Sequence, residues 1–190
     1  MTQSSRLHYR FQKELMSTTT TLECTNCGET LTPERRNYRY SESGLSNVIL
    51  QGVEVADCPK CKNSNVIIPK MMKIHAAIAK ALANSPVRLT GEQFRFFRNH
   101  LGLSGDKFGT YLHTDKTKIS KWERNEDKIG PATDRLVRLL VVTLDSELRP
   151  CGVAVAEHLP LISDESGESY ELHVDVITLQ TSFCRVSKAA

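Results

Sequence analysis

Cys24-Thr-Asn-Cys27 and, thirty residues further along, Cys58-Pro-Lys-Cys61 are two cysteine pairs of identical spacing. Two residues between paired cysteines allow a tight turn that directs both sulfur atoms at one ion, and Gly28 supplies backbone freedom after the first pair. Thiolates are soft ligands, and four of them suit the tetrahedral preference of Zn²⁺. The pattern therefore predicts one structural Zn²⁺ per chain, held by Cys24, Cys27, Cys58 and Cys61, with no open position for a substrate. Two unrelated redox or core pairs are the alternative interpretation.

The length and composition favour a small cytoplasmic protein. The chain has 190 residues, enough for one ordinary domain or two to three small ones. Residues 1–21 are polar and lack the apolar core of a secretory signal, and no apolar run has the length of a membrane-spanning helix. We expect Cys151 and Cys184, which lie outside the two pairs, to be small buried apolar residues.

The net charge of +3 is unevenly distributed. Residues 151–190 contain six acidic and two basic residues, a net charge of −4, which leaves residues 1–150 at +7. Within the basic part, residues 88–124 contain eight Lys or Arg against four Asp or Glu. This asymmetry points weakly to a nucleic acid partner, because many basic surfaces are only solvated.

Hydrophobic periodicity divides the chain into five parts and predicts an α+β fold. After a polar lead (1–21), a β-rich zinc module is expected over residues 22–70 and a linker helix over residues 71–87. An all-helical part follows at residues 88–150. Residues 151–190 should form a β-hairpin, in which residues 170–176 alternate as a half-buried strand and residues 153–155 are the candidate partner strand.

Capping signals place four helices between residues 88 and 150. Thr90 with Gln93 has the pattern of a capping box, Ser104 and Asp115 can cap the next two helices, and Pro131 can open the fourth. Gly109 lies inside the second helix, where we expect the close approach of another helix. The fourth helix is apolar on two sides. We expect its buried stripe to consist of Leu136, Leu139, Leu140 and Thr143, and a two-fold partner to cover Val137, Val141 and Leu144.

The second and third helices, joined by a short turn, have the pattern of a helix-turn-helix. If Ile119 and Trp122 point into the core, the opposite face of the third helix is basic and polar. Such a face can enter the major groove of double-stranded DNA, with Lys107 placed to meet a phosphate. The candidate DNA-binding residues are Lys107, Lys116, Thr117, Lys118, Ser120, Lys121 and Arg124. The alternative is an ordinary solvated Lys-rich helix.

The run Leu112-His-Thr-Asp-Lys-Thr-Lys-Ile-Ser-Lys-Trp-Glu-Arg-Asn125 resembles the turn and recognition helix of Cro/repressor-type proteins. Together with the four cysteines, residues 22–148 resemble the MqsA (YgiT-type) antitoxins. The resemblance implies zinc ligation by the four cysteines, dimerisation through the helix-turn-helix part, and binding to a palindromic operator. It implies base reading chiefly by Thr117 and Lys121, and neutralisation of a cognate toxin. Residues 151–190 have no counterpart in the short antitoxins.

The sequence thus predicts a DNA-binding transcriptional regulator of the antitoxin type that represses its own operon as a homodimer. The alternative is a protein-interaction module that neutralises a toxin or another partner with little or no DNA binding. An enzyme is not expected, because the chain lacks the His-x-Glu of a zinc deaminase, a nucleophile elbow and a phosphate loop. No membrane and no small-molecule substrate are expected among its partners. The lone histidines His75, His113 and His173 are read as surface or hydrogen-bonded residues.

Overall fold

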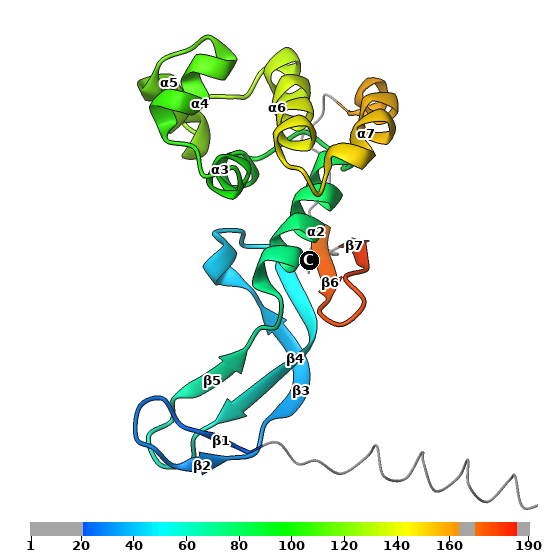
Figure 1. The fold of residues 1–190 in the computed structure, drawn as a ribbon. Helices are drawn as coiled ribbons and strands as arrows, with labels where there is room; N and C mark the ends of the chain where they lie inside the picture. Colours follow the sequence, from blue (N-terminus) through cyan, green and yellow to red (C-terminus); the bar gives the residue numbers. More distant parts are fainter. Residues whose placement is uncertain (1–20, 164–169, 186–190) are drawn as a thin grey trace, which may run out of the picture. The chain divides into compact units, whose positions relative to one another are not determined.

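The computed structural model describes residues 21–163 and 170–185 and has a mixed α+β fold (Figure 1). Contacts divide the chain into two compact units. Unit 1 combines residues of Met1–Arg36 with Val53–Ile67, and unit 2 combines Asn37–Gly52 with Ile68–Ala190. Residues 164–169, whose polar sequence Asp-Glu-Ser-Gly-Glu-Ser predicts a turn before the strand at residues 170–176, lie outside the described residues. Within the described ranges, no helix has the length and apolar character needed to cross a membrane.

Unit 1 is built from short antiparallel strand pairs. Strand β1 (Leu22–Glu23) pairs with β2 (Thr30–Leu31), and β5 (Ser64–Ile67) pairs with the second half of β4 (Val48–Asp57). Its small core consists of Cys24, Leu31, Ala56 and Cys58. A core of this size buries little apolar surface, so unit 1 is the part of the chain whose stability depends most on additional cross-links.

One sheet has the strand order β3-β4-β6-β7, with β5 added beside β4. Strand β3 is Glu34–Arg39, β6 is Tyr170–Asp175 and β7 is Thr181–Arg185. The first half of β4 pairs with β6 in parallel, from Val48 opposite Leu172 to Gln51 opposite Asp175. Strands β6 and β7 pair antiparallel. At Gly52 the φ angle is +77°, a conformation that glycine adopts without strain, and here β4 changes its partner from β6 to β5.

The predicted alternation of residues 170–176 is confirmed, since Leu172, Val174 and Val176 are buried. The partner predicted for this strand is wrong. Val153 and Val155 lie in helix α7 (Gly152–His158), and β6 pairs with β4 and β7 instead. A short Val-x-Val run does not distinguish a strand from a helix by its sequence. In the structure only one residue of this run, Val155, is buried.

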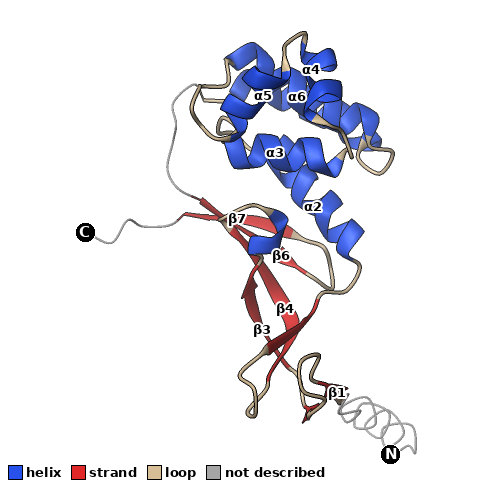
Figure 2. Ribbon diagram, turned by 90° about the vertical axis from the view of Figure 1, so that its left-hand side faces the viewer, coloured by secondary structure: helices blue, strands red, loops and turns tan. Residues whose placement is uncertain are grey.

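The helices of unit 2 gather on one side of strands β6 and β7 (Figure 2). Helix α2 (Met71–Ala83) contacts β6 and β7 as well as α3 and α6. The helices that follow are α3 (Gly91–His100), α4 (Gly105–Leu112), α5 (Lys116–Glu123) and α6 (Pro131–Leu144). Three single turns of 3-10 helix complete the unit: Ser41–Ser43, Arg149–Cys151 and Leu159–Leu161.

The helix starts are where the capping signals placed them. Thr90 and Gln93 form a reciprocal capping box, and the side chains of Ser104 and Asp115 accept hydrogen bonds from backbone N–H groups in the first turns of α4 and α5. Pro131 occupies the first turn of α6. Each signal acts within one helical turn, so it does not depend on the tertiary fold.

The predicted buried stripe of α6 is wrong, and so is the expectation that a two-fold partner covers Val137 and Val141. Val137 and Val141 are fully buried, whereas Leu136 is 41% exposed and Leu139 and Leu140 are half-buried. The side of α6 that is buried is the one that also carries a charged pair, Asp134 and Arg138. Arg138 donates hydrogen bonds to Asp134 and to the last carbonyls of α2 and the segment after it, which fastens α6 to the end of α2.

Candidate metal centre and basic helix surface

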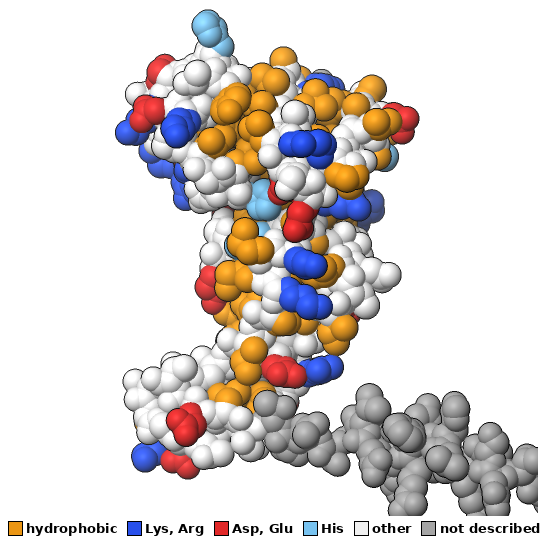
Figure 3. All heavy atoms as spheres, viewed as in Figure 1, with side chains coloured by type: hydrophobic (Ala, Val, Ile, Leu, Met, Phe, Trp, Pro, Cys, Tyr) orange, Lys and Arg blue, Asp and Glu red, His pale blue; other side chains and the backbone are white. Residues whose placement is uncertain are grey.

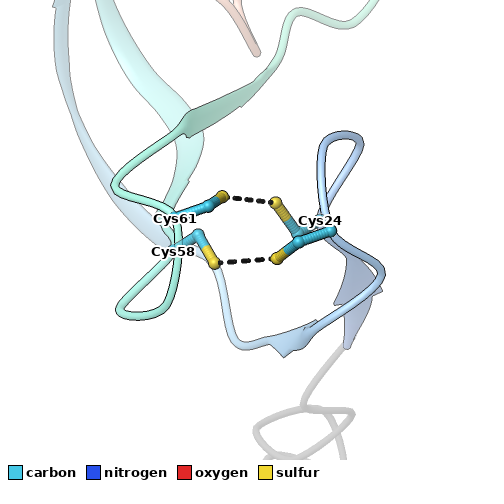
Figure 4. A group of neighbouring side chains, drawn as sticks. Cys24, Cys58 and Cys61 are labelled. Atoms are coloured by element: carbon cyan, nitrogen blue, oxygen red, sulfur yellow. Dashed lines mark hydrogen bonds between the residues drawn. The ribbon is translucent and has the colours of Figure 1, made fainter.

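The four paired cysteines come together in unit 1. Their sulfur atoms all lie within 4.8 Å of one another (Figure 4). The Sγ atoms of Cys24 and Cys61 are 3.5 Å apart, as are those of Cys27 and Cys58. A tetrahedral ion with metal–sulfur bonds of about 2.3 Å requires sulfur–sulfur distances of roughly 3.8 Å, so the four sulfurs need shifts of only about 1 Å. The predicted ligand set is therefore grouped as a metal site requires.

Two loops of similar geometry present the sulfurs. In the first, the N–H of Gly28 donates to the carbonyl of Cys24 and the N–H of Cys24 donates to the carbonyl of Glu29, both within 2.9 Å. In the second, Lys62 and Asn63 make the equivalent bonds with Cys58. Gly28 and Lys62 both have positive φ, +73° and +62°. The second loop thus places a lysine in a conformation that glycine adopts more easily.

Hydrogen bonds favour the ionised thiol at Cys24 and Cys61 but not at Cys27. The pKa of Cys24 is lowered to about 6, chiefly by the backbone N–H of Asn26. The pKa of Cys61 is also lowered, first by the side chain of Asn26. A backbone N–H of Glu29 lowers the pKa of Cys27, but burial and the neighbouring thiols outweigh it and raise the value to about 12. Four adjacent thiols cannot all ionise without a cation, and a divalent metal would supply that charge.

The other two cysteines lie apart from this cluster. Cys151 is half-buried and Cys184 is exposed on β7, so the expectation that both are buried is wrong. Cys184 lies on β7, whose five side chains are all exposed.

Helices α4 and α5 are joined by the three residues His113–Asp115. A Cβ atom added to Gly109 would lie 2.5 Å from the carbonyl oxygen of Thr114, and the N–H of Thr114 donates to the carbonyl of Gly109 at 2.9 Å. The close neighbour of Gly109 is therefore the backbone of the turn and not another helix, which corrects the expectation. His113 is in the left-handed region, with φ +51° and ψ +48°.

Helix α5 is fixed on its inner side. Ile119 and Trp122 are buried, and the Trp122 ring packs edge-on against Phe94 of α3. Glu123 accepts two hydrogen bonds from the guanidinium of Arg98, at 2.6 and 3.2 Å. A bidentate ion pair of this kind restrains both the position and the rotation of α5 relative to α3.

The outer side of α5 is basic. Lys116, Thr117 and Lys121 are exposed, as is Lys107 on α4. Within the described part of the chain, Lys107 and Lys121 form no ion pair, and Lys116 approaches exposed Asp106 at 3.6 Å. Because both members of that pair are solvated, it holds Lys116 only weakly.

Two of the predicted residues have neighbours that sequence spacing did not reveal. Lys118 forms an ion pair with Asp127 and lies 5.7 Å from the centre of the Trp122 ring. Arg124 binds Glu126 at 2.5 Å and also bonds to Ser120, and the bond from Arg124 lowers the pKa of the Glu126 carboxyl. These contacts compete with any external partner of Lys118 and Arg124. On this surface, the described lysines that form no ion pair are Lys107 on α4 and Lys121 in the last turn of α5.

The single histidines have ordinary environments. His75 bonds to the hydroxyl of Tyr40 at 2.8 Å, His173 bonds to Gln51 at 3.1 Å, and His113 is exposed. The buried residues Asn65, Asp134 and Arg138 were missed, because a polar side chain is assigned to the surface unless its tertiary partners are known.

Comparisons with known proteins identify no relative. No protein-family model matches the chain, and no curated protein or solved structure matches it. The cysteine cluster and the helical part are therefore the features that bear on the class of this protein.

Proposed function

We propose that this protein is a sequence-specific, double-stranded DNA-binding transcriptional regulator of the antitoxin type, with α4 and α5 as its helix-turn-helix. The observation that carries the proposal is the exposed basic outer side of α5, supported from behind by buried Ile119 and Trp122. A recognition helix needs both properties, because its side chains must reach base edges while its position is fixed by the scaffold.

Individual roles follow from position on α5. Thr117 and Lys121 lie one turn apart and are exposed, so they are the proposed base readers, with Lys116 and Ser120 beside them. A lysine can donate to guanine O6 and N7, and a threonine can contact a base edge or a thymine methyl group. Lys107, on the preceding helix, is proposed to meet a phosphate.

A second copy of the chain is the proposed partner in DNA binding. Leu136 and Leu144 of α6 are 41% and 40% exposed, and Val153 of α7 is 74% exposed. Hydrophobic side chains are visible over α6 and α7 in Figure 3. A two-fold dimer through this surface would bury these side chains and present two copies of α5 to a palindromic operator. Contact with a two-fold partner, which the sequence predicted for Leu144, is therefore proposed for Leu136 as well.

A structural Zn²⁺ is the proposed occupant of the cysteine cluster. The ion would supply the positive charge that the thiolates require and stabilise a unit whose apolar core is small. The antitoxin role, with a cognate toxin as partner and the operon of this gene as target, rests on the resemblance in residues 22–148. Copurification with the product of the adjacent reading frame tests that part separately.

DNA binding is tested by fluorescence anisotropy with the upstream region of this gene and with a scrambled duplex. Lys121→Ala should weaken operator binding by about 1–3 kcal/mol and relax the preference at one base position. Lys107→Ala should weaken binding to both duplexes alike and reduce the salt dependence. If the unmodified protein binds both duplexes equally, the interaction-module alternative replaces this proposal.

Metal binding is tested by elemental analysis of the purified protein and by chelation. We expect one Zn²⁺ per chain, and loss of structure in unit 1 on chelation while the helical circular dichroism of unit 2 persists. Cys58→Ser should have the same effect as chelation, because a structural metal contributes directly to the folding free energy. A metal-free protein with an intact unit 1 would refute the zinc assignment.

A further inference from the structure

Asn65 is a buried polar residue next to the cysteine cluster. It lies on β5, four residues after Cys61, and its exposed fraction is 6%. Its Nδ2 donates to the Sγ of Cys24 at 3.6 Å and lies 3.4 Å from the carbonyl oxygen of Ala56. A buried side-chain amide is costly unless its hydrogen bonds are made, so its placement against a sulfur calls for a reason.

The other end of the same amide holds the loop that carries Cys24. Oδ1 of Asn65 accepts from the backbone N–H of Thr25 at 3.0 Å and from its hydroxyl at 2.8 Å. Asn65 is in the strand that follows the second cysteine pair, whereas Thr25 is inside the first pair. One side chain therefore links the two loops and also donates to one of the sulfurs.

A tetrathiolate site around a divalent cation has a net charge of −2, and N–H donors to sulfur disperse that charge. Residues that hydrogen-bond to metal ligands commonly affect metal affinity by about 10- to 100-fold. In a site whose ligands come from two loops, the residue that joins the loops also fixes the separation of the ligand pairs. Asn65 has the contacts for both effects.

We infer that Asn65 is a positioning residue of the metal centre: it holds the first cysteine loop against the second and withdraws electron density from the Cys24 sulfur. The inference rests on the proposed metal binding. It extends that proposal by assigning to a residue outside the four ligands a share of the metal affinity and of the electronic properties of the site.

The test uses the full chain loaded with Zn²⁺ or, for spectroscopy, with Co²⁺. Asn65→Leu removes the donor and also the acceptor for Thr25. Asn65→Asp keeps an oxygen for Thr25 but removes the donor to sulfur. Asn63→Asp is the charge-matched control, because the Asn63 side chain donates to the Thr25 hydroxyl and not to a sulfur. Zinc affinity is measured by competition with a chelator, and the sulfur-to-cobalt charge-transfer band by absorption.

Both Asn65 variants should bind zinc about 10- to 100-fold more weakly than the unmodified protein. Their charge-transfer band should move to lower energy, because a sulfur without its N–H donor gives up an electron more easily. Asn63→Asp should leave the band in place. A role limited to folding would lower stability without moving the band.

The outcomes separate this inference from the metal proposal itself. If the unmodified protein binds neither Zn²⁺ nor Co²⁺, the proposed metal site is refuted. If it binds both, and Asn65→Asp has the affinity and the band of the unmodified protein, only the role of Asn65 is refuted. If Asn65→Leu does not fold, the affinity and the band of Asn65→Asp alone decide whether Asn65 has the inferred role, since this variant retains the contact with Thr25.

Discussion

Arg138 offers the sharpest test of how unit 2 is held together. Its side chain is fully buried, and its Nε donates to Oδ1 of Asp134 at 2.7 Å. The rest of the guanidinium caps the carboxyl end of α2 and the segment that leads to α3. The carbonyl oxygens that accept from it, at 2.6 to 3.3 Å, belong to Leu82, Ala83, Ser85 and Val87.

Arg138→Met keeps an unbranched apolar side chain but removes all of these donors. Loss of one member of a buried ion pair costs about 3–5 kcal/mol, since the remaining charge is left without its partner. Carbonyls that lose their donor add to this, at about 1–3 kcal/mol for each one that water does not reach. With at least one such carbonyl, we expect a decrease of at least about 4 kcal/mol in the free energy of unfolding of unit 2.

The double variant Asp134→Leu/Arg138→Met removes both members of the ion pair. Removing both members of a buried ion pair is often neutral when hydrophobic residues fill the space. Here the double variant should stay destabilised, because the carbonyls at the end of α2 still lack their donors and the backbone N–H of Leu89, which donates to Asp134 at 2.6 Å, loses its acceptor. A double variant as stable as the unmodified protein would show that these backbone groups do not depend on the pair.

Urea unfolding monitored by circular dichroism at 222 nm provides the measurement. Arg135→Met is the matched control on the same helix, because Arg135 is half-buried and donates to the carbonyl of Leu159. Its loss should cost about 0.5–1.5 kcal/mol. If Arg138→Met costs no more than Arg135→Met, the proposed role of Arg138 as the cap of α2 is wrong.

Two further predictions concern the helical part. Gly109→Ala should lower the stability by about 1–3 kcal/mol, as overpacking does, because the added Cβ would lie 2.5 Å from the Thr114 carbonyl oxygen. Thermal unfolding is the measurement. Gly130→Ala is the control, since a Cβ added at Gly130 would have no atom within 4 Å. The pKa of Asp145 is lowered below 3.8, since burial raises it but hydrogen bonds from His100 and from backbone N–H groups outweigh that effect. The ionised Asp145 carboxylate therefore contributes stability above pH 3.8, and this contribution is lost as the pH falls through the lower pKa of the folded protein. We expect Asp145→Asn to be less stable at neutral pH and to lose less stability as the pH is lowered in an acid-unfolding experiment. An unchanged acid dependence would contradict the assignment.

Features encoded within a few residues could be predicted from the sequence. The caps at Thr90, Ser104 and Asp115 are set by one side chain and the backbone of the next turn, and all three are present. The grouping of the four cysteines also followed from their spacing. In each case the pattern specifies its own geometry without reference to the rest of the chain.

The side of α6 that is buried could not be predicted in this way. The helix is apolar on two sides, so periodicity alone does not choose between them. The choice depends on Arg138, whose burial is favourable only because unpaired carbonyls at the end of α2 surround it. Asn65 was missed for a similar reason, because its partners Thr25 and Cys24 precede it by forty residues or more in sequence.

The pairing of β4 with β6 has a consequence for the order in which the protein folds during synthesis. Val48 and Leu50 meet Leu172 and Val174, more than 120 residues later in the chain. Until the ribosome has delivered β6, this apolar half of β4 lacks its parallel neighbour, and such an exposed strand edge favours aggregation. The carboxy-terminal hairpin is therefore an integral part of unit 2, and we expect ribosome-bound chains that end near residue 150 to depend on chaperones more than the full-length chain does.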